Sequence, residues 1–455
     1  MTVNINKYLN SYSQASTLAF FRLAFGLIMV LSLIRFASYG WIEKFYIQPL
    51  FHFTYYGFNW VKPIGNLIYF LFIICGIAAF CVSIGYRYRL AIITFFLSFS
   101  YIELIDKTTY LNHYYFISVV SFVLIFLPAN AYFSVDAYRN PKIAFEKIPR
   151  WTIDILKVLL GIVYFYAGLA KINSDWLFKA MPLKIWLPNN ASLPFVGSFF
   201  NENWLHFAFS WAGMIYDLSI VFLLLYKRTR IFAFVIVVIF HALTRFLFPI
   251  GIFPYVMIVS SLIFFDAGFH QKCLRIISKL IRLNAAIFDN GKVKIQNFTI
   301  AYKTRLIIIM SFLVTQLLLP FRYLAYPNEL FWTEEGFRFS WRVMLMEKAG
   351  YTEFTVTDAK TRKTIKVINS QFLTPFQEKQ MAFQPDFILE YAHFLRDYYQ
   401  SIGFNDPEVY VNSYVALNGR LSQKYIDPKI NLAKENETLH HKTWILPFND
   451  EIKGF

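Results

Sequence analysis

The feature that most constrains this chain is a series of long apolar segments in its first 320 residues. A helix needs roughly 20 apolar residues to cross about 30 Å of hydrocarbon, and shorter helices can cross when other helices surround them. With 57% hydrophobic and only 16% charged residues, one soluble domain could not bury so much apolar surface. We count nine candidate spans, near 16–37, 66–84, 89–106, 113–132, 152–171, 205–225, 230–247, 251–266 and 304–320.

The remainder of the chain has a different pattern. Segments 351–358 and 363–369 alternate apolar and polar residues around a turn, 386–403 has helical spacing, and 409–419 alternates again. We therefore predict a polytopic α-helical membrane bundle over residues 1–320, followed by a small α+β domain over residues 321–455.

Charge gives an orientation. The net charge of +16 comes largely from Lys and Arg in every second loop between the predicted spans, and loop 267–303 is the most basic of these loops. The positive-inside rule then predicts a cytoplasmic N-terminus, and nine crossings place residues 321–455 outside the cytoplasm. Such compact loops suit a bacterial inner membrane. Topology explains the basic residues better than nucleic-acid binding does.

One lysine lies at an unusual position, at the end of a predicted membrane span. A charge inside a membrane segment costs about 2.5 kcal/mol or more, so it needs a reason. Lys171 follows the apolar segment GIVYFYAGLA near the outer end of the fifth predicted span. Removing a lysine from water weakens its charged form and can make it a base. The alternative is that Lys171 extends to the lipid headgroups.

Further polar residues lie at the same predicted face. His113 can exchange protons near neutral pH, and Asn112 can orient a neighbour, hold an oxyanion or simply cap a helix. His241 and Arg245 are four residues apart, on one face of the seventh span. A single buried histidine is more often structural than a ligand. The aromatic stretch 331–341 is either core or the edge of a groove near the membrane.

Several catalytic motifs do not occur in the sequence. It has no HExxH, CxxC, P-loop or dinucleotide-type GxGxxG motif. These absences argue against common metal hydrolases, nucleotide-driven pumps and Rossmann dehydrogenases. We expect no metal.

The chain resembles the vitamin K-dependent gamma-carboxylases, whose membrane part belongs to the wider group of horizontally transferred transmembrane domains. Fragments in both predicted domains carry the resemblance in order. They are FRLAFGLIMVL at 21–31, LIDKTTYLNH at 104–113, NAYFSVDA at 130–137, YFYAGLAKINSDW at 164–176, FH…FPIGIFPYVM at 240–257, QLLLPFRY at 316–323, FRFSW at 337–341 and VYVNSYVALNGRLSQKYIDPKINL at 409–432.

The resemblance implies an activity and roles for residues. A lysine at the position of Lys171 deprotonates reduced vitamin K, and oxygen converts the resulting anion to a strongly basic alkoxide. The alkoxide removes the γ proton of a peptide glutamate, and CO₂ adds to the carbanion that this leaves. The quinone finally leaves as its epoxide. The family's functional histidine lies in an Asp-Lys-Thr…Asn-His stretch, which here gives Asn112 and His113. We further expect His241, Arg245, Trp341, Ser340 and Phe337 to contribute to quinol or substrate binding. In a bacterial membrane the quinol would be menaquinol, and the partner a secreted or membrane protein that contains glutamate.

Two departures from the animal enzymes leave alternatives open. Met346 stands where animal members have a histidine that handles the glutamyl peptide. The three cysteines are Cys75, Cys81 and Cys273, so the predicted outer domain has none to link it to the bundle, and we expect packing to hold the domains together. One alternative is a family member that oxidises quinol without carboxylating a peptide. The other is a transporter or scaffold without catalytic activity.

Overall fold

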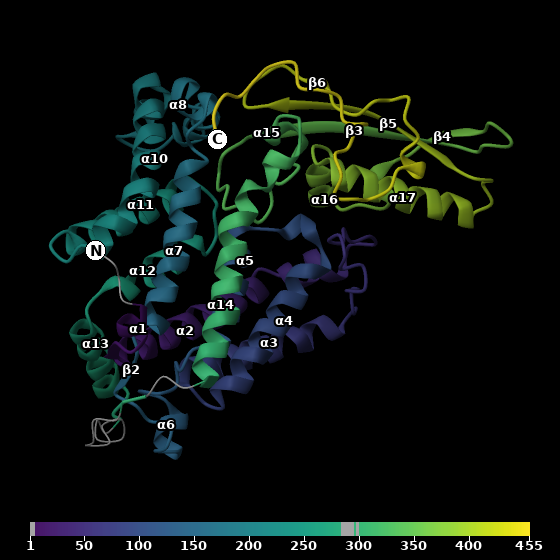
Figure 1. Cartoon of the computed structure of the whole chain (residues 1–455). Coiled ribbons are helices and arrows are strands. Elements are labelled where there is room, and N and C mark those ends of the chain that lie inside the picture. The colour runs from purple at the N-terminus through teal and green to yellow at the C-terminus, as the bar shows by residue number, and fades with distance from the viewer. Residues whose placement is uncertain (1–4, 284–294, 297–299) are drawn as a thin grey trace.

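A computed structural model describes residues 5–283, 295–296 and 300–455. It shows a bundle of helices with a small sheet-containing domain at one end (Figure 1). Within the described residues, seven helices are long and apolar enough to cross a membrane. They are α2 (Ser16–Ser38), α3 (Leu67–Ile84), α4 (Tyr88–Ile105), α7 (Trp151–Leu169), α10 (Asn203–Leu225), α11 (Arg230–Leu247) and the segment Tyr302–Ala325, formed by α14 (Ile300–Leu318) and a 3₁₀ turn (Leu319–Ala325).

Two shorter apolar helices complete the bundle. They are α5 (Asn112–Phe126) and α12 (Phe253–Ser261), which a 3₁₀ turn extends to Phe264. All nine predicted segments are therefore helical, and the predicted membrane bundle is confirmed. The fourth segment is shorter than the predicted 113–132. Its helix ends at Phe126 because Leu127 is extended, as the residue before a proline tends to be.

The outer face of α3 illustrates how the sequence suits a bilayer. Phe70, Ile77 and Phe80 are 54–63% exposed, whereas Cys75 and Val82 are fully buried against neighbouring helices. Large apolar side chains exposed along a helix are stable in lipid, where the helix satisfies its own backbone hydrogen bonds. The exposed stripe is therefore the face that contacts the membrane.

Short elements join the spans at both ends of the bundle. At the end remote from the sheet lie β1 (Tyr12–Gln14), paired antiparallel with β2 (Lys147–Pro149), together with α6 (Val135–Arg139) and α13 (Ala267–Leu280). Nearby in sequence, α1 (Ile5–Leu9) precedes β1. Residues 284–294 of the most basic predicted loop lie outside the described residues. The remaining connecting elements are Glu43–Ile47, Lys107–Thr109, α8 (Ser174–Lys179), α9 (Leu183–Trp186), Leu187–Asn190 and Gly197–Asn201.

The final part of the chain forms a four-stranded antiparallel sheet in the order β4-β3-β5-β6. The strands are β3 (Lys348–Thr357), β4 (Thr364–Lys366), β5 (Glu408–Leu417) and β6 (Gln423–Lys424). The long central pair runs from Lys348 opposite Leu417 to Thr357 opposite Glu408. The predicted α+β character of this part is confirmed, since the alternating segments form strands and the segment from Asp386 lies in a helix.

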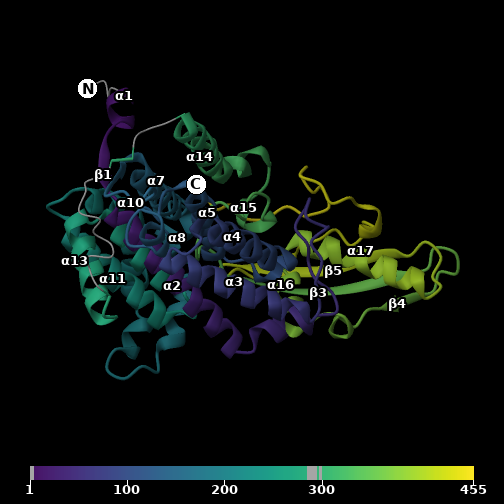
Figure 2. The same cartoon turned by 90° about the horizontal axis from the view of Figure 1, so that it is seen from below.

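Helices cover one face of this sheet. The main ones are α16 (Pro375–Met381) and α17 (Pro385–Ser401), and the shorter elements are α15 (Leu330–Thr333), Asn369–Gln371 and Leu432–Lys434. Phe387, Tyr391 and Leu395 of α17 are buried in the core beneath β3 and β5. In Figure 1, α16 and α17 lie between the sheet and the bundle, and in Figure 2 the sheet domain projects sideways beyond the bundle.

A buried lysine joins the two parts. Lys107, in the turn between α4 and α5, is 2% exposed, and its Nζ lies 3.1 Å from Asp386, 2.9 Å from Glu390 and 3.7 Å from Glu437. Next to it, Gln377 of α16 donates a hydrogen bond to Asp106 at 2.9 Å. Our expectation that packing alone would hold the domains together was therefore incomplete. Ion pairs contribute as well, because Lys107 needs anionic partners once it is removed from water.

A second ionic contact lies nearer to Lys171. Asp175, at the start of α8, accepts two hydrogen bonds from the Arg420 guanidinium at 2.6 and 2.7 Å and one from Asn418 at 2.9 Å. The chain end runs beside it, with Phe455 N donating to Ile172 O at 2.9 Å. The contacts of Lys107 and Asp175 therefore hold the sheet-containing domain, residues 321–455, over this end of the bundle. We keep the name outer domain for it, after its predicted side of the membrane.

Candidate functional site

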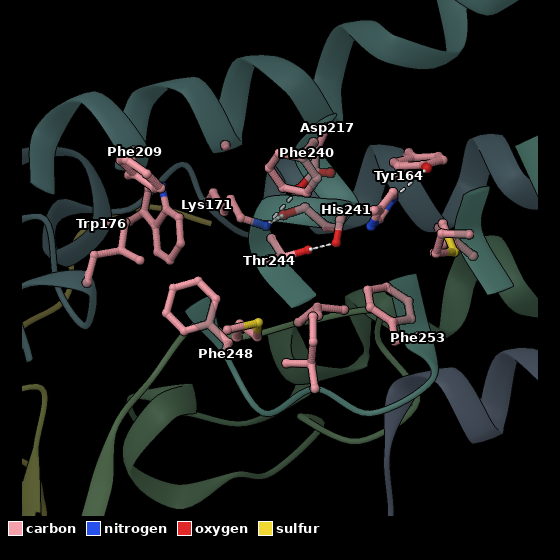
Figure 3. Close-up of a pocket in the computed structure, with 18 of the residues that line it drawn as sticks. Tyr164, Lys171, Trp176, Phe209, Asp217, Phe240, His241, Thr244, Phe248 and Phe253 are labelled. Atoms are coloured by element: carbon pink, nitrogen blue, oxygen red, sulfur yellow. Dashed lines mark hydrogen bonds and ion pairs between the residues drawn. The ribbon is translucent and has the colours of Figure 1, made fainter. Parts of the chain in front are cut away.

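A largely apolar pocket lies at the end of the bundle that the outer domain covers (Figure 3). Its cavity volume is about 90 Å³. Small-molecule sites are lined mostly by apolar and aromatic side chains with a few polar groups. The aromatic lining residues are Tyr164, Trp176, Trp186, Phe209, Phe240, Phe248 and Phe253, and the polar ones include Lys171, Asp217, His241 and Thr244.

Lys171 lines this pocket and is paired. Its Nζ donates a hydrogen bond to Asp217 Oδ2 at 2.7 Å and another to Ala167 O at 3.1 Å. Both charged side chains are 8% exposed, and the ammonium group also lies over the Trp176 ring, 5.3 Å from its centroid. Lys171 therefore does not extend to the headgroups. It is held inside the protein by a carboxylate on another helix.

A glycine makes this pairing possible. Lys171 follows α7 and Asp217 belongs to α10, and the two helices approach closely at Gly168. A Cβ atom on Gly168 would lie 2.8 Å from Leu218 Cγ and 2.9 Å from its backbone nitrogen. Such distances exclude a side chain, so Gly168 lets α7 and α10 come together beside the ion pair.

His241 contributes a second polar group to the pocket. Its Nε2 lies 3.2 Å from the Tyr164 hydroxyl, whereas its Nδ1 is buried without a hydrogen-bond partner among the described residues. Buried polar atoms are nearly always hydrogen-bonded, so an unpartnered one in a pocket wall is a candidate for contact with a ligand. Thr244, one turn along α11, hydrogen-bonds to the His241 carbonyl and lines the same pocket.

The outer domain closes the pocket through Val343 and Met344. The backbone around these residues is strained. Phe339, Trp341 and Met344 have φ angles of 61°, 60° and 53°. Bulky residues seldom adopt positive φ, and each costs on the order of 1–3 kcal/mol. Strain of this kind persists only where the surrounding structure fixes the backbone. The fixed backbone in turn sets the positions of Val343 and Met344.

His113 lines a second, adjoining pocket. This pocket has a volume of about 270 Å³, and it shares Ile250, Phe253, Val343 and Met344 with the first. The Phe253 ring lies between two imidazoles, with its centroid 5.8 Å from that of His113 and 5.8 Å from that of His241. The structure therefore brings Lys171 and His241 into one pocket and places His113 directly across a shared wall.

Asn112 connects the bundle to the covering segment. Its Nδ2 donates to the Arg342 carbonyl at 3.0 Å, and its Oδ1 accepts from the Tyr110 hydroxyl at 3.1 Å. The side chain makes no capping hydrogen bond at the start of α5, where Leu111 is the N-cap. Asn112 lines the His113 pocket and holds the backbone immediately before Val343 and Met344.

Four predicted binding residues line neither pocket. Arg245 is exposed on α11. Trp341 is fully buried, with its ring 4.8 Å from that of Tyr115. The Ser340 hydroxyl donates to the Phe337 carbonyl, and the Phe337 ring packs against Phe331. Trp341, Ser340 and Phe337 thus anchor the segment that leads to the covering residues.

Sequence reasoning missed Asp217 and the covering pair. Asp217 is an isolated carboxylate within the apolar segment 205–225, so the argument applied to Lys171 would also have singled it out. Val343 and Met344 gave no such signal, because two apolar residues in a mixed segment are ordinary. Their place depends on how the outer domain sits on the bundle.

Comparison with known families agrees with this arrangement. A model described as the HTTM domain matches residues 10–269, more than half of the chain. A model described as the vitamin K-dependent gamma-carboxylase lumenal domain matches residues 301–451. The chain belongs to the vitamin K-dependent gamma-carboxylase family. No solved structure matches it. Gamma-carboxylases act on glutamate-containing proteins and use vitamin K hydroquinone, so this chain is a carboxylase-like integral membrane protein.

Proposed function

We propose that this protein couples the oxidation of a quinol by O₂, which yields the quinone epoxide, to the carboxylation of peptide glutamate with CO₂. The observation that carries the proposal is the buried Lys171–Asp217 pair in an aromatic pocket that the outer domain covers. Lys171 is the proposed base. His113 and Asn112 are proposed to act in the adjoining pocket, with Asn112 as a positioning residue.

The aromatic lining of the pocket suits the ring system of a quinol. Trp176, Phe209, Phe240 and Phe253 offer ring faces and edges for an aromatic ligand, and the polar atoms of Lys171, Asp217 and His241 are available for its oxygens. The unpartnered His241 Nδ1 is the atom that most needs such a ligand. When bound, a reduced vitamin K or menaquinol would supply an acidic hydroxyl and, with O₂, the driving force for carboxylation.

The ion pair suggests how Lys171 becomes a base inside the protein. An ammonium ion cannot accept a proton, but one proton can move along the 2.7 Å hydrogen bond to Asp217. The result is a neutral amine and a neutral acid, and a low-dielectric pocket favours neutral groups over separated charges. Lys171 Nζ could then take a proton from a ligand hydroxyl, within hydrogen-bond reach.

The covering segment would protect the chemistry from water. Val343 and Met344 close both pockets from the side of the outer domain, and Asn112 holds the preceding backbone in place. Excluding water strengthens the electrostatic interactions inside and prevents competing proton transfer. In this proposal, the outer domain is the cover of a site that lies in the membrane bundle.

We also propose an orientation and a source of quinol. The loops at the end of the bundle remote from the sheet are the basic ones, which supports a cytoplasmic N-terminus and an outer domain on the opposite side. This arrangement fits a bacterial inner membrane, where menaquinol would be the quinol and a secreted or membrane protein the substrate.

The test uses the full-length protein in lipid nanodiscs. It would receive reduced vitamin K or, in parallel, menaquinol, together with O₂, radiolabelled bicarbonate and a glutamyl peptide. We expect epoxide to form and label to enter the glutamyl peptide, but not a matched peptide with glutamine in place of glutamate. If neither quinol gave epoxide or label, the proposal would be wrong.

One observation favours a second candidate function, quinol oxidation without peptide carboxylation. Met346 packs against the core of the outer domain and offers no group that exchanges protons, at the position where animal members have histidine. Epoxide formation without label in any glutamyl peptide would favour a family member that oxidises quinol alone.

A further inference from the structure

The pocket that contains His113 also contains an unpaired cation. Arg35, in the last turn of α2, lines this pocket, and its Nε is buried without a hydrogen-bond partner among the described residues. The pocket lining includes no Asp or Glu, and no described carboxylate lies within 4.0 Å of the Arg35 guanidinium. Arg35 is partly buried, and a buried guanidinium N–H without a partner favours a ligand that accepts a hydrogen bond, best of all an anionic one.

The surroundings of Arg35 hold its guanidinium in one place. The group lies over the Trp41 ring at 5.0 Å and the Tyr39 ring at 5.7 Å from their centroids. The turn at Gly251 lies against it, since a Cβ atom there would be 3.5 Å from Arg35 Nη2. Contacts of this cation–π type use none of the guanidinium N–H donors, which can then bind a carboxylate in a bidentate manner.

The position of this pocket suggests which carboxylate it takes. Its lining includes His113 and Asn112, and its shared wall with the Lys171 pocket consists of Ile250, Phe253, Val343 and Met344. A group bound at Arg35 would therefore lie beside the proposed quinol pocket and under the outer domain. The remaining lining is mostly apolar, which suits the methylene groups of a glutamyl side chain better than a fully hydrated inorganic anion.

We infer that Arg35 binds the γ-carboxylate of the glutamyl side chain and is the residue that distinguishes glutamate from glutamine. The inference rests on the proposed function, because it names the substrate group that the second pocket receives. A cation beside this carboxylate also stabilises negative charge that develops on the adjacent carbon. Arg35 thus has a role in both binding and reactivity.

The test measures peptide binding without turnover. The full-length protein in nanodiscs, without quinol, is titrated with a fluorescent glutamyl peptide and with the matched glutaminyl peptide. We expect the parent to bind the glutamyl peptide at least about tenfold more tightly, the size of one charge-assisted contact. Arg35→Gln should abolish the preference, and Arg35→Lys should keep part of it. Lys44→Gln, an exposed cation at the same end of the bundle, should leave it unchanged.

Three results would overturn the inference. The first is a parent protein that binds both peptides equally, and the second is an Arg35→Gln variant that keeps the preference for the glutamyl peptide. The third is an Arg35→Gln variant in which only the dependence of activity on bicarbonate changes. Thermal unfolding of each variant checks folding, and the Arg35→Lys variant provides a binding readout if Arg35→Gln unfolds. An Arg35-dependent preference in a parent that forms neither epoxide nor carboxylated peptide would contradict the proposed function alone.

Discussion

Lys171 Nζ lies 2.7 Å from Asp217 Oδ2, and both side chains are almost fully buried. The pair changes how Lys171 should be understood. The sequence suggested a lone lysine made basic by removal from water, whereas the structure provides a carboxylate that can receive the proton of the lysine. In the proposed mechanism, Asp217 is therefore as important as Lys171.

We expect Asp217→Asn to lower epoxide formation by about 10²–10⁴-fold, the usual contribution of a proton-transfer group. An amide still accepts a hydrogen bond from Lys171, but it cannot take up the proton. The measurement is the initial rate of epoxide formation at saturating quinol. Asp266→Asn, in which the replaced side chain is 61% exposed and paired with Arg230, is the matched control and should keep the parent rate. An active Asp217→Asn variant would remove Asp217 from the mechanism.

Two glycines on α7 provide a second prediction. A methyl group on Gly168 would lie 2.8–2.9 Å from Leu218, whereas one on Gly161 would meet Val221 at an ordinary 3.6 Å. We expect Gly168→Ala to separate α7 from α10 and destabilise the protein by about 1–3 kcal/mol, as overpacking does. It should also slow epoxide formation, because Lys171 and Asp217 move apart.

Gly161→Ala is the matched control on the same pair of helices. It should leave both the unfolding temperature and the rate near those of the parent. Equal behaviour of the two variants would show that close packing at Gly168 does not support the ion pair.

The contact at Lys107 provides a third prediction. Lys107→Gln leaves Asp386, Glu390 and Glu437 near one another without their shared cation. Removing one partner of a buried ion pair costs about 3–5 kcal/mol, so we expect a clear drop in Tm and faster proteolysis between the bundle and the outer domain. Lys429→Gln, an exposed lysine in the outer domain, should change neither. An unchanged Tm for Lys107→Gln would mean that packing alone holds the domains together.

The same contact predicts a dependence on pH. Burial alone would raise the pKa of the Asp386 carboxyl, but the charges of Arg338 and Lys107 outweigh it and hold this pKa well below its usual range. A carboxyl of this kind contributes stability above its unfolded pKa of about 3.9 and loses that contribution as the pH falls below it. The difference in Tm between parent and Asp386→Asn should stay constant from about pH 7 to pH 5 and shrink below about pH 4. A difference that instead shrank between pH 7 and pH 5 would contradict this account.

The helical spans and the small α+β domain could be predicted because each depends on local pattern. Long apolar segments give helices in a membrane, and alternation between Tyr351 and Asp358 gives a strand wherever the domain sits. The error at the fourth span arose at Leu127, where Pro128 ends the helix within an apolar segment.

The site depends on distant contacts, so the sequence predicted only some of its polar members. Lys171 was visible as a charge in an apolar segment, but its pairing with Asp217 requires two helices to pack at Gly168. The covering role of Val343 and Met344 depends on positive φ angles and on the hydrogen bond from Asn112, neither of which has a sequence pattern.

The most direct test of the central claim is the rate of quinol epoxide formation by Lys171→Ala, measured on protein with the same Tm and elution profile as the parent. We expect a loss of at least about 10²-fold, because the proposed base is removed while the aromatic pocket remains. A Lys171→Ala variant that formed epoxide and carboxylated the glutamyl peptide at the parent rate would contradict the role of the Lys171–Asp217 pair.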